Sequence, residues 1–451
     1  MTGAGEPARV LALVDGEHYP PVLIDAIEHL RARGDDVVAA VMLGGGEKLR
    51  APMALGDLPV HTGATQLDAL REGLRATGPD LVVDVSDAPV VGVRERFALA
   101  CVSLASGAAY AGGGFRFDAL PAGRTGVPTI AVIGTGKRTG KTAVSAALAR
   151  HAASRGMRPI IVAMGRGGPA EPVVMHGEIA RPTVADLVAL ADAGQHAASD
   201  VYEDALVAGV TTVGARRAGA GLAGIPVHDT VARAIEAARA ERPDLLILEG
   251  SGTAIPPFAA GATLLVAGGA TPAREIEEAL GPLRLLISDL VVVTMAEEPI
   301  LSAETLSALN STIGEFGVTS PVVSTVFRPI PLGDVAGKRV LLATTAPKGA
   351  GQVLRRHLET VHGPTVVGIT HHLSDRTELT RDLARAEGTY EVLVTELKAA
   401  AIDVAARAAL DAGADVVFFD NEPVSTGADL GAAFDGLISR ALNGALEQEP
   451  R

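Results

Sequence analysis

A chain of 451 residues with 53 acidic and 39 basic side chains, a formal net charge of −14 and 3% aromatic residues does not fit general nucleic-acid binding, which needs a basic face and stacking aromatics. The single cysteine, Cys101, excludes an internal disulfide framework and a cysteine-built zinc site, and we expect it to pack in a core. Because no apolar run is long enough to span a bilayer and the N-terminus lacks the pattern of a signal peptide, we expect a cytoplasmic protein without a membrane partner.

Residues 1–125 predict an N-terminal doubly wound, Rossmann-like α/β domain. Apolar strands are expected at residues 8–14, 36–42 and 81–85, with helices between them. Ligands of such sheets bind at the carboxyl ends of the strands, where this chain places the polar residues Asp15, Glu17, His18 and Asp87 and a loop at 44–47. These residues indicate either a ligand site or turns and caps. A glycine-rich connector at 106–115 then predicts a domain boundary near residue 125.

Residues 126–328 predict a P-loop NTPase-type α/β domain. A buried strand at 129–133 leads into the loop Gly134-Thr135-Gly136-Lys137-Arg138-Thr139-Gly140-Lys141-Thr142, and a helix follows. Glycines let backbone N–H groups face a polyphosphate, and the helix N-terminus adds partial positive charge. In this interpretation Lys141 reaches the β- and γ-phosphates of a nucleotide, and Thr142 offers its hydroxyl to Mg²⁺.

The loop is a variant of the standard pattern. A standard P-loop has glycine five positions before the last glycine, and that position holds Thr135 here, with Gly134 and Gly136 on each side. The spacing resembles that of dethiobiotin synthetase and related ATP-dependent ligases. The alternative is a glycine turn that caps a helix beside an incidental lysine.

Three arginines in this acidic chain are candidates for binding transferred or substrate phosphate. Arg166 follows a strand at 158–163 between glycines, where it could stabilise a transferring phosphoryl group. Arg216 and Arg217 occur in the glycine-lined segment 213–224, which we expect to be flexible, and guanidinium forks bind phosphate in a bidentate manner. Solvated loop arginines are the alternative for all three.

The pattern LILEGSGTAIPP at 246–257 predicts the metal partner of the P-loop. Glu249 ends a buried strand at 244–248, and a carboxylate on the strand beside the P-loop strand is suited to Mg²⁺, which takes oxygen ligands from protein and nucleotide. Glu249, Gly250 and Gly252 also resemble the corresponding stretch of dethiobiotin synthetase. We expect contacts to the nucleotide base from loops after the strands at 263–267 and 289–294.

Residues 329–451 predict a C-terminal α/β extension that packs on the P-loop domain. Strands are expected at 339–345, 365–369, 390–397 and 415–419, after a strand at 322–326 that falls at the end of the P-loop domain. The glycine turn at 346–351 could bind a second anion. The neighbouring His371 and His372 favour no zinc site, because adjacent strand residues face opposite ways. Lys398 lies beside acidic strand ends. It indicates either one side of a second metal site or substrate site, or a structural ion pair.

Taken together, the motifs resemble those of the cyclic 2,3-diphosphoglycerate synthetase family along nearly the whole chain. They include DGEHYPP, VIGTGKRTGKT, VAMGRGGP, GARRAGAGLAG, LEGSGTAIPP, TELKAAAIDV and FDNEP. The resemblance implies an ATP-dependent ligase that closes 2,3-diphosphoglycerate, a small anionic phosphorylated substrate, into a cyclic pyrophosphate and releases ADP and phosphate.

Such chemistry needs neutralisation of phosphate charge and no general base, and we expect Lys141, Arg166, Arg216 and Arg217 to be the catalytic residues, aided by Lys137 or Arg138. We also expect a homodimer. A dethiobiotin- or cobyrinate-type carboxylate ligase is one alternative, and a non-enzymatic nucleotide switch or metallochaperone of the same fold class is another.

Overall fold

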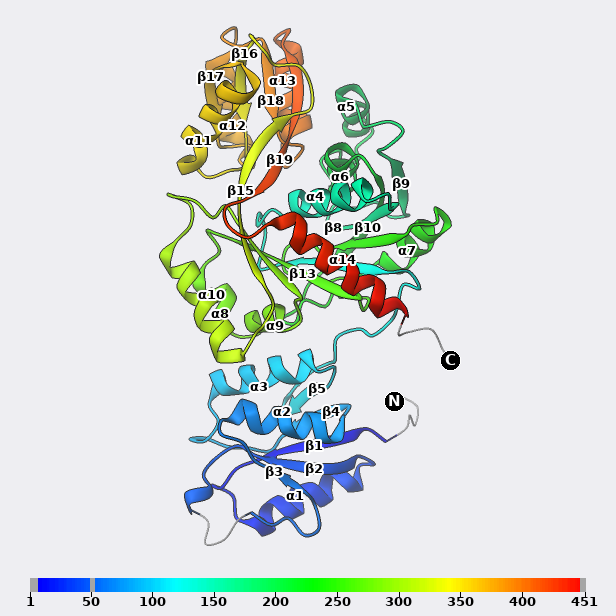
Figure 1. Ribbon diagram of the computed structural model, residues 1–451, viewed down its shortest axis with the longest axis vertical. Coiled ribbons are helices and arrows are strands. Elements are labelled where there is room, and N and C mark those ends of the chain that lie inside the picture. Colours follow the sequence, from blue (N-terminus) through cyan, green and yellow to red (C-terminus); the bar gives the residue numbers. More distant parts are fainter. Residues whose placement is uncertain (1–6, 49–52, 447–451) are drawn as a thin grey trace. The chain divides into compact units, whose positions relative to one another are not determined.

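The structure is a computed structural model that describes residues 7–48 and 53–446, shown in Figure 1. Residues 1–6, which belong to the segment without a signal-peptide pattern, lie outside the described residues. The fold is α/β throughout, as the sequence predicts. The chain divides into two compact units, residues 1–122 with 273–287 and 308–319, and residues 123–272 with 288–307 and 320–451.

The first unit contains a six-stranded sheet in the order β3-β2-β1-β4-β5-β6, parallel except for the β5–β6 hairpin. Its strands are β1 (Arg9–Val14), β2 (Asp36–Met42), β3 (Val60–His61), β4 (Leu81–Asp84), β5 (Ala109–Gly112) and β6 (Phe115–Phe117). Its helical segments are α1 (Pro20–Ala32), η1 (Gly46–Lys48), α2 (Gln66–Thr77), α3 (Val93–Ala105), α8 (Ala273–Glu277) and α9 (Gly281–Leu286).

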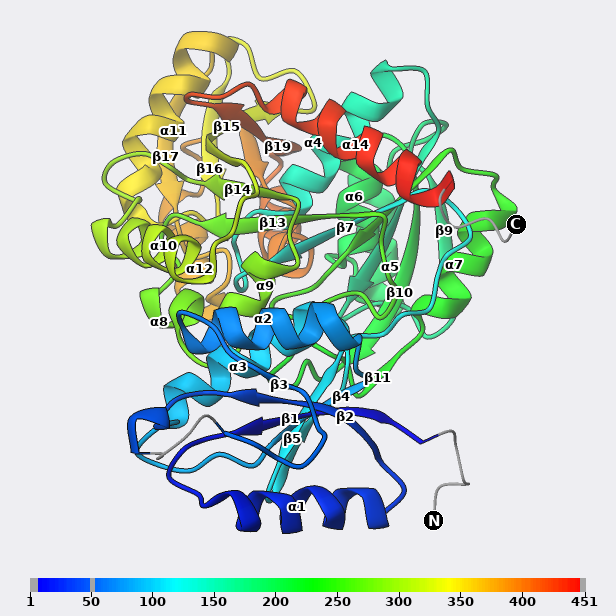
Figure 2. The same ribbon diagram turned by 60° about the horizontal axis from the view of Figure 1, so that its bottom comes forward.

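Helices cover both faces of this sheet, with α1 on one side and α2 and α3 on the other (Figure 2). The apolar residues of β1 are therefore buried on both faces, which explains why the strand is continuously apolar rather than alternating. Cys101 lies fully buried in α3, as the sequence predicts, and burial raises the pKa of its thiol to about 12.

The second unit contains a 13-stranded sheet within the described residues, in the order β11-β10-β8-β12-β7-β13-β14-β15-β19-β18-β16-β17, with β9 paired to β10. The first half comprises β7 (Thr129–Gly134), β8 (Pro159–Gly165), β9 (Val173–His176), β10 (Thr211–Ala218), β11 (His228–Asp229), β12 (Leu245–Glu249), β13 (Ala262–Gly268) and β14 (Leu290–Thr294). The second half comprises β15 (Val322–Pro331), β16 (Arg339–Ala343), β17 (Thr365–Thr370), β18 (Val392–Thr395) and β19 (Asp415–Ser425).

Helices pack on both faces of this longer sheet. They are α4 (Lys141–Ser154), α5 (Val184–Asp192), α6 (Asp200–Ala208), α7 (Val231–Ala240), α11 (Gly351–His357), α12 (Arg376–Ala386), α13 (Arg407–Asp411) and α14 (Leu430–Leu446), with the short segments η2 (Lys348–Ala350), η3 (Leu358–His362) and η4 (Ala401–Ala406). A further helix, α10 (Ala303–Phe316), passes from this unit into the other along the chain.

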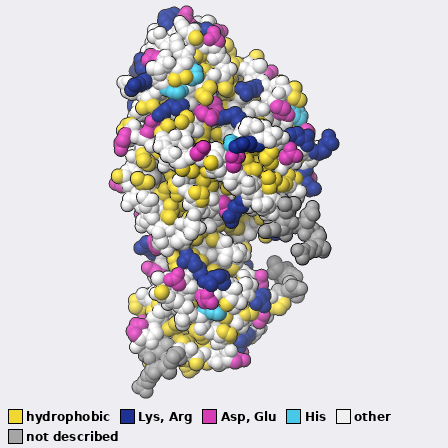
Figure 3. Space-filling view, viewed as in Figure 1, with side chains coloured by type: hydrophobic (Ala, Val, Ile, Leu, Met, Phe, Trp, Pro, Cys, Tyr) yellow, Lys and Arg dark blue, Asp and Glu magenta, His cyan; other side chains and the backbone are white. Residues whose placement is uncertain are grey.

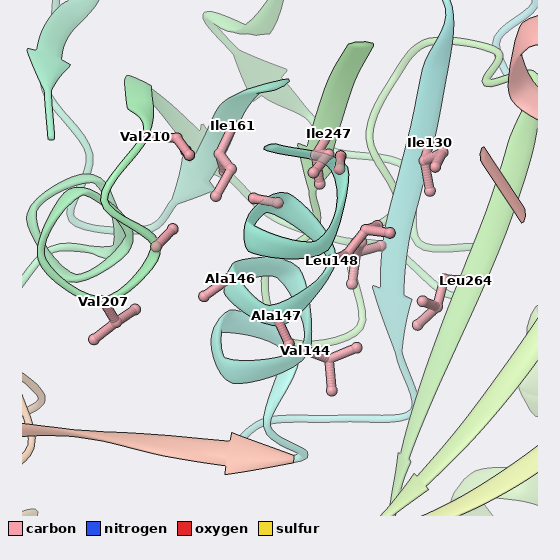
Figure 4. Close-up of a cluster of buried hydrophobic side chains, with 14 of the residues drawn as sticks. Ile130, Val144, Ala146, Ala147, Leu148, Ile161, Val207, Val210, Ile247 and Leu264 are labelled. Atoms are coloured by element: carbon pink, nitrogen blue, oxygen red, sulfur yellow. The ribbon is translucent and has the colours of Figure 1, made fainter. Parts of the chain in front are cut away.

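The main core surrounds α4, the helix that follows the P-loop (Figure 4). Its alanines at 146, 147, 149 and 152 are buried together with Leu148, and the helix packs against α6, α14 and the sheet. Small side chains let the helix be enclosed on all sides. Burial of Leu148 alone stabilises the fold by about 2 kcal/mol.

The antiparallel pair β15–β19 reverses the direction of the sheet, and the two strands run side by side into the C-terminal part (Figure 1). Strand β15 begins parallel to β14, whereas β19 begins parallel to β18. Each of these two strands then extends beyond its own set of parallel strands toward the other set. The carboxyl edges of the P-loop strands and of the C-terminal strands therefore face each other. The proposed boundary at residue 328 falls within β15, and the division into three domains remains a prediction.

One expected element was wrong. The segment 213–224 was expected to be flexible, but residues 211–218 form strand β10, which pairs in register with β8. Neighbouring residues of a strand point to opposite faces, so Arg216 is exposed whereas Arg217 is buried.

On the face of the molecule seen in Figure 3, acidic and basic side chains are interspersed, so the acidic excess does not gather in one block there.

Candidate active site

The glycine-rich loop joins β7 to α4 at the carboxyl edge of the sheet. Gly140 caps α4 with a φ of 90°, a left-handed conformation that favours glycine. Lys141 is buried, and its Nζ donates to the backbone oxygens of Gly136 at 2.8 Å and Gly252 at 3.1 Å. Burial lowers the pKa of Lys141 to about 8, against the effect of the nearby Glu249 carboxylate. The ammonium is thus held over the loop, where a bound anion would raise its pKa again.

Thr142 and Glu249 are brought together as predicted for a metal site. Strand β12 is the direct neighbour of β7, and Glu249 at its end pairs with Val132. The Thr142 hydroxyl donates to Glu249 Oε1 at 2.9 Å, whereas Glu249 Oε2 is buried without a hydrogen-bond partner. Burial raises the pKa of Glu249 to about 7. A buried hydroxyl and a half-satisfied carboxylate are hard oxygen donors that fit Mg²⁺.

Helix α6 adds three acidic residues that the sequence analysis did not select: Asp200, Glu203 and Asp204. Their spacing of three and four residues puts them on one face of the helix. Asp204 is fully buried, and both of its carboxylate oxygens lack a hydrogen-bond partner. Burial raises its pKa well above the usual value, and the charge of Glu249 raises it further. Acidic residues on the buried face of an otherwise apolar helix were the signal available in the sequence.

These carboxylates do not form a complete metal cage. Within residues 7–48 and 53–446, no group of three or more His, Cys, Asp or Glu side chains is arranged to hold a metal ion. A cation here would depend on nucleotide phosphates for its remaining ligands, which is how Mg²⁺ is commonly held in phosphoryl-transfer enzymes.

A cluster of cations lies on the other side of Lys141, around Gly252. A Cβ placed on Gly252 would lie 3.5 Å from a terminal nitrogen of Arg217, 3.7 Å from one of Arg166 and 3.7 Å from Cγ of Lys137. The charge of Arg166 lowers the pKa of Lys137, and Arg138 acts in the same direction. We call Lys137, Arg138, Arg166 and Arg217 the cation cluster.

Among the described residues no carboxylate lies within ion-pair distance of the cation cluster, although the charge of Asp200 acts on Arg166 and Arg217. Arg217 is 7% exposed and donates to the backbone oxygens of Ser251 at 2.6 Å and Gly219 at 2.8 Å. Burial lowers the pKa of Arg217, and Arg166 lowers it further. In the described part of the chain no member of the cluster forms a salt bridge within 4 Å. Unpaired guanidinium and ammonium groups held close together are suited to a multiply charged anion.

Arg216 lies apart from this cluster. Its side chain is on the exposed face of β10, and its Nε donates to the backbone oxygen of Gly168 at 3.1 Å. The two adjacent arginines therefore point to opposite faces of β10 and do not converge on one place in this structure. One arginine is buried and the other exposed because the pair lies in a strand. The glycines around the pair had instead predicted a flexible segment.

Loops after β13 and β14 contact the P-loop, where base contacts were expected. Thr294 donates its hydroxyl to the backbone oxygen of Thr139 at 2.6 Å, and the hydroxyls of Thr135 and Thr271 lie 3.0 Å apart. Met295, directly after β14, has a φ of 54°. Base recognition by these loops remains a prediction.

The other polar groups considered from sequence are paired internally. In the first unit Asp15 accepts hydrogen bonds from the backbone nitrogens of Glu17, His18 and Asp87, as a turn residue does. In the C-terminal part His371 bonds the backbone oxygen of Ala346, whereas His372 bonds the carboxylate of Asp382.

A glycine-rich loop between a central parallel strand and a buried helix, with a carboxylate on the neighbouring strand, defines a P-loop nucleotide-binding α/β protein. Family models agree along the chain. The N-terminal, P-loop and C-terminal domains of cyclic 2,3-diphosphoglycerate synthetase match residues 9–118, 129–326 and 331–422. The chain belongs to the cyclic 2,3-diphosphoglycerate synthetase family.

Curated relatives named cyclic 2,3-diphosphoglycerate synthetase match over almost their full length. The one from Methanothermus fervidus is 43% identical over 445 residues, which cover 96% of this chain and 97% of the relative. The one from Rubrobacter xylanophilus is 43% identical over 423 residues, covering 93% and 95%. The one from Thermococcus gammatolerans is 44% identical over 420 residues, covering 92% and 93%. No helix in the described residues is long and apolar enough to cross a membrane.

Proposed function

We propose that this chain is a ligase that uses ATP to close 2,3-diphosphoglycerate into cyclic 2,3-diphosphoglycerate, with release of ADP and phosphate. The observation that carries the proposal is the position of the unpaired cation cluster next to the P-loop lysine. A nucleotide-binding loop and a second site for a multiply charged anion thus share one edge of the sheet. Membership of the family and the names of its relatives point to the same activity.

The loop residues Gly134 to Thr142 are proposed to bind the phosphates of ATP. The backbone N–H groups of the loop and the N-terminus of α4 attract them, and Lys141 exchanges its two carbonyl partners for phosphate oxygens. Mg²⁺, which neutralises and orients nucleotide phosphates when bound, would be held by Thr142 and Glu249.

The cation cluster is proposed to hold the phosphates of the substrate. Arg166 and Arg217 approach the same face of Gly252 and direct their guanidinium nitrogens to one place. Lys137 adds a third charge, and Arg138 a fourth. For Arg216 we retain a role in substrate handling as a prediction, and its exposed location favours a weaker effect than that of Arg217.

The chemistry proceeds in two displacements. An oxygen of one substrate phosphate attacks the γ-phosphorus of ATP in line, the bond to the β-phosphate oxygen breaks, and ADP leaves. An oxygen of the other substrate phosphate then attacks the phosphorus of the activated phosphate, and inorganic phosphate leaves with its electron pair. The second step is intramolecular and gains from proximity. Phosphate oxygens are ionised at neutral pH, so the cations need only offset repulsion.

The alternatives receive less support from the site. A carboxylate ligase would need the P-loop and Glu249 but not a cluster of four cations without carboxylate partners. A nucleotide switch or metallochaperone would not need a second anion site. We further propose a homodimer in the cytoplasm, which light scattering of the purified protein and fractionation of the source cells would test.

Incubation of the enzyme with ATP, Mg²⁺ and 2,3-diphosphoglycerate tests the proposal directly. We expect equal amounts of ADP and phosphate and a product with the phosphorus NMR signals of a cyclic pyrophosphate. ATP hydrolysis that 2,3-diphosphoglycerate does not stimulate, with no new phosphorus signal, would contradict it. A panel of monophosphoglycerates and of dethiobiotin and cobyrinate precursors distinguishes the carboxylate ligases.

A further inference from the structure

The C-terminal part contributes a charged side chain to the edge of the sheet that carries the P-loop. Strand β18 ends at Thr395, and Lys398 follows at its carboxyl end. Because β15 and β19 are antiparallel, this end faces the carboxyl ends of the P-loop strands. Lys398 Nζ accordingly lies 3.0 Å from Glu203 Oε1 on α6, although the two residues belong to distant parts of the sequence.

The ammonium of Lys398 is not saturated by this ion pair. An ammonium has three N–H donors, and within the described residues Glu203 is the one carboxylate within 4 Å of it. The Lys398 side chain is 28% exposed, whereas that of Glu203 is 9% exposed. Donors of Lys398 therefore remain available on the side away from α6.

The charges of the P-loop site act on Lys398. The charge of Lys398 lowers the pKa of Lys141, and the charge of Glu249 acts to raise the pKa of both lysines. Burial acts to lower the pKa of Lys398, but the carboxylates of Glu203 and Glu396 outweigh it and raise the pKa. Lys398 is therefore a cation within electrostatic range of the P-loop lysine and of Glu249.

We propose that Lys398 is a second catalytic lysine, which binds the phosphoryl group in transfer from the side opposite the P-loop, and that Glu203 is its positioning residue. The inference rests on the proposed function and names a further residue of the same site. It assigns a direct role in phosphoryl transfer to the C-terminal part. A cation that is already held in place and contacts only the transferring phosphoryl group stabilises the charge that develops there in the transition state. The protein does not have to rearrange for this to happen.

The test compares nucleotides that differ in the γ-phosphate. Isothermal titration of the full-length protein with ADP and with the non-hydrolysable analogue AMP-PNP, both with Mg²⁺, gives a ratio of affinities. For Lys398→Met we expect AMP-PNP binding to weaken roughly 10-fold and ADP binding to change less than about 2-fold. Glu203→Gln should shift the ratio in the same direction but less, and Lys398→Arg should retain part of the preference.

Lys338→Met is the matched control, because Lys338 lies in the same C-terminal part and only approaches Asp415, at 4.0 Å. If the Lys398→Met protein shows the wild-type ratio of affinities, the inference is overturned. The ion pair between Lys398 and Glu203 would then have only a structural role. If Lys398→Met does not fold, Glu203→Gln decides: a wild-type ratio of affinities in that variant overturns the inference. The ratio does not involve 2,3-diphosphoglycerate, so a failure of the proposed function appears separately, in the phosphorus NMR experiment.

Discussion

Thr142 donates its hydroxyl to Glu249 across 2.9 Å, although 107 residues separate them in the sequence. The contact exists because β12 lies directly beside β7, which brings the end of one strand next to the first turn of the helix after the other. The second oxygen of Glu249 is left buried and unpartnered. That arrangement makes the carboxylate the most direct point at which to test metal dependence.

We expect Glu249→Gln to remove the gain in ATP affinity that Mg²⁺ provides. The amide preserves shape but has no negative charge for a divalent cation, so titrations with ATP in Mg²⁺ and in EDTA should give similar affinities. Turnover should fall by about 100-fold or more. Glu171→Gln is the control, since Glu171 forms an exposed ion pair with Arg233. An unchanged Mg²⁺ effect in Glu249→Gln would move the metal site elsewhere.

Lys141→Ala should abolish turnover without loss of the fold. Because the ammonium is buried and its pKa is lowered to about 8, its charge contributes no stability to the empty protein. We expect an unfolding midpoint equal to or above that of the wild type, together with a loss in rate of about 100-fold or more. Differential scanning calorimetry and an ADP-release assay check both parts. Turnover near the wild-type rate would refute the P-loop interpretation.

Arg217→Ala and Arg216→Ala should differ, because strand β10 sends the two side chains to opposite faces. Loss of Arg217 removes a guanidinium from the cation cluster, and we expect KM for 2,3-diphosphoglycerate to rise by about 10-fold or more. Arg216→Ala should have a smaller effect. Arg233→Ala, on the exposed face of α7, is the control for surface charge. Equal effects at the two positions would place the substrate outside the cluster.

The sequence predicted the local chemistry of this site better than its three-dimensional surroundings. Lys141 and Thr142 begin the helix after the glycine-rich loop and Glu249 ends the neighbouring strand, and the sequence spacing indicated all three positions. Asp200, Glu203 and Asp204 on α6 were not selected from the sequence, because the sequence does not show that this face of the helix is buried. Their burial depends on packing against α4 and β8, which are distant from α6 in the sequence.

Lys398 and Arg217 illustrate two further limits. Lys398 reaches α6 only because β15 and β19 invert the sheet, a tertiary arrangement that the strand pattern does not contain. Arg217 is buried because β10 continues through a glycine-lined segment whose composition predicts flexibility. Glycines at 214 and 219 accommodate close neighbours there: a Cβ on Gly214 would lie 3.0 Å from the Pro169 ring.

The stability of the protein should depend on the ionisation of Asp420. Burial raises the pKa of Asp420 to about 6, although Arg150, at 2.9 Å, acts to lower it. Between about pH 4 and pH 6 the native state therefore binds more protons at this site than the unfolded chain, and stability falls as the pH rises. Two pKa units correspond to about 3 kcal/mol.

Asp420→Asn removes this titration. Urea unfolding of both proteins at several values from about pH 4 to pH 7 should show the wild type losing up to about 3 kcal/mol relative to the variant over that range. Asp415→Asn serves as the control, because Asp415 is exposed on the same strand. A difference between wild type and Asp420→Asn that stays constant with pH would mean that Arg150 keeps Asp420 ionised throughout.

Gly140 should tolerate no side chain, for two independent reasons. Its φ of 90° is strained for any residue with a Cβ, and a Cβ placed there would lie 2.2 Å from Cζ of Phe327 on β15. Gly140→Ala should therefore displace either the P-loop or the strand that leads to the C-terminal part. We expect weaker ATP binding and a lower unfolding midpoint, measured by titration and calorimetry.

The double variant Gly140→Ala, Phe327→Ala separates the two reasons. Removal of the ring relieves the contact but not the backbone strain, so ATP binding should recover only in part, with a residual loss of about 1–2 kcal/mol from the left-handed conformation. Phe327→Ala alone should bind ATP nearly as the wild type does. If the double variant binds no better than Gly140→Ala, the ring does not limit the loop, and backbone conformation alone explains the requirement for glycine.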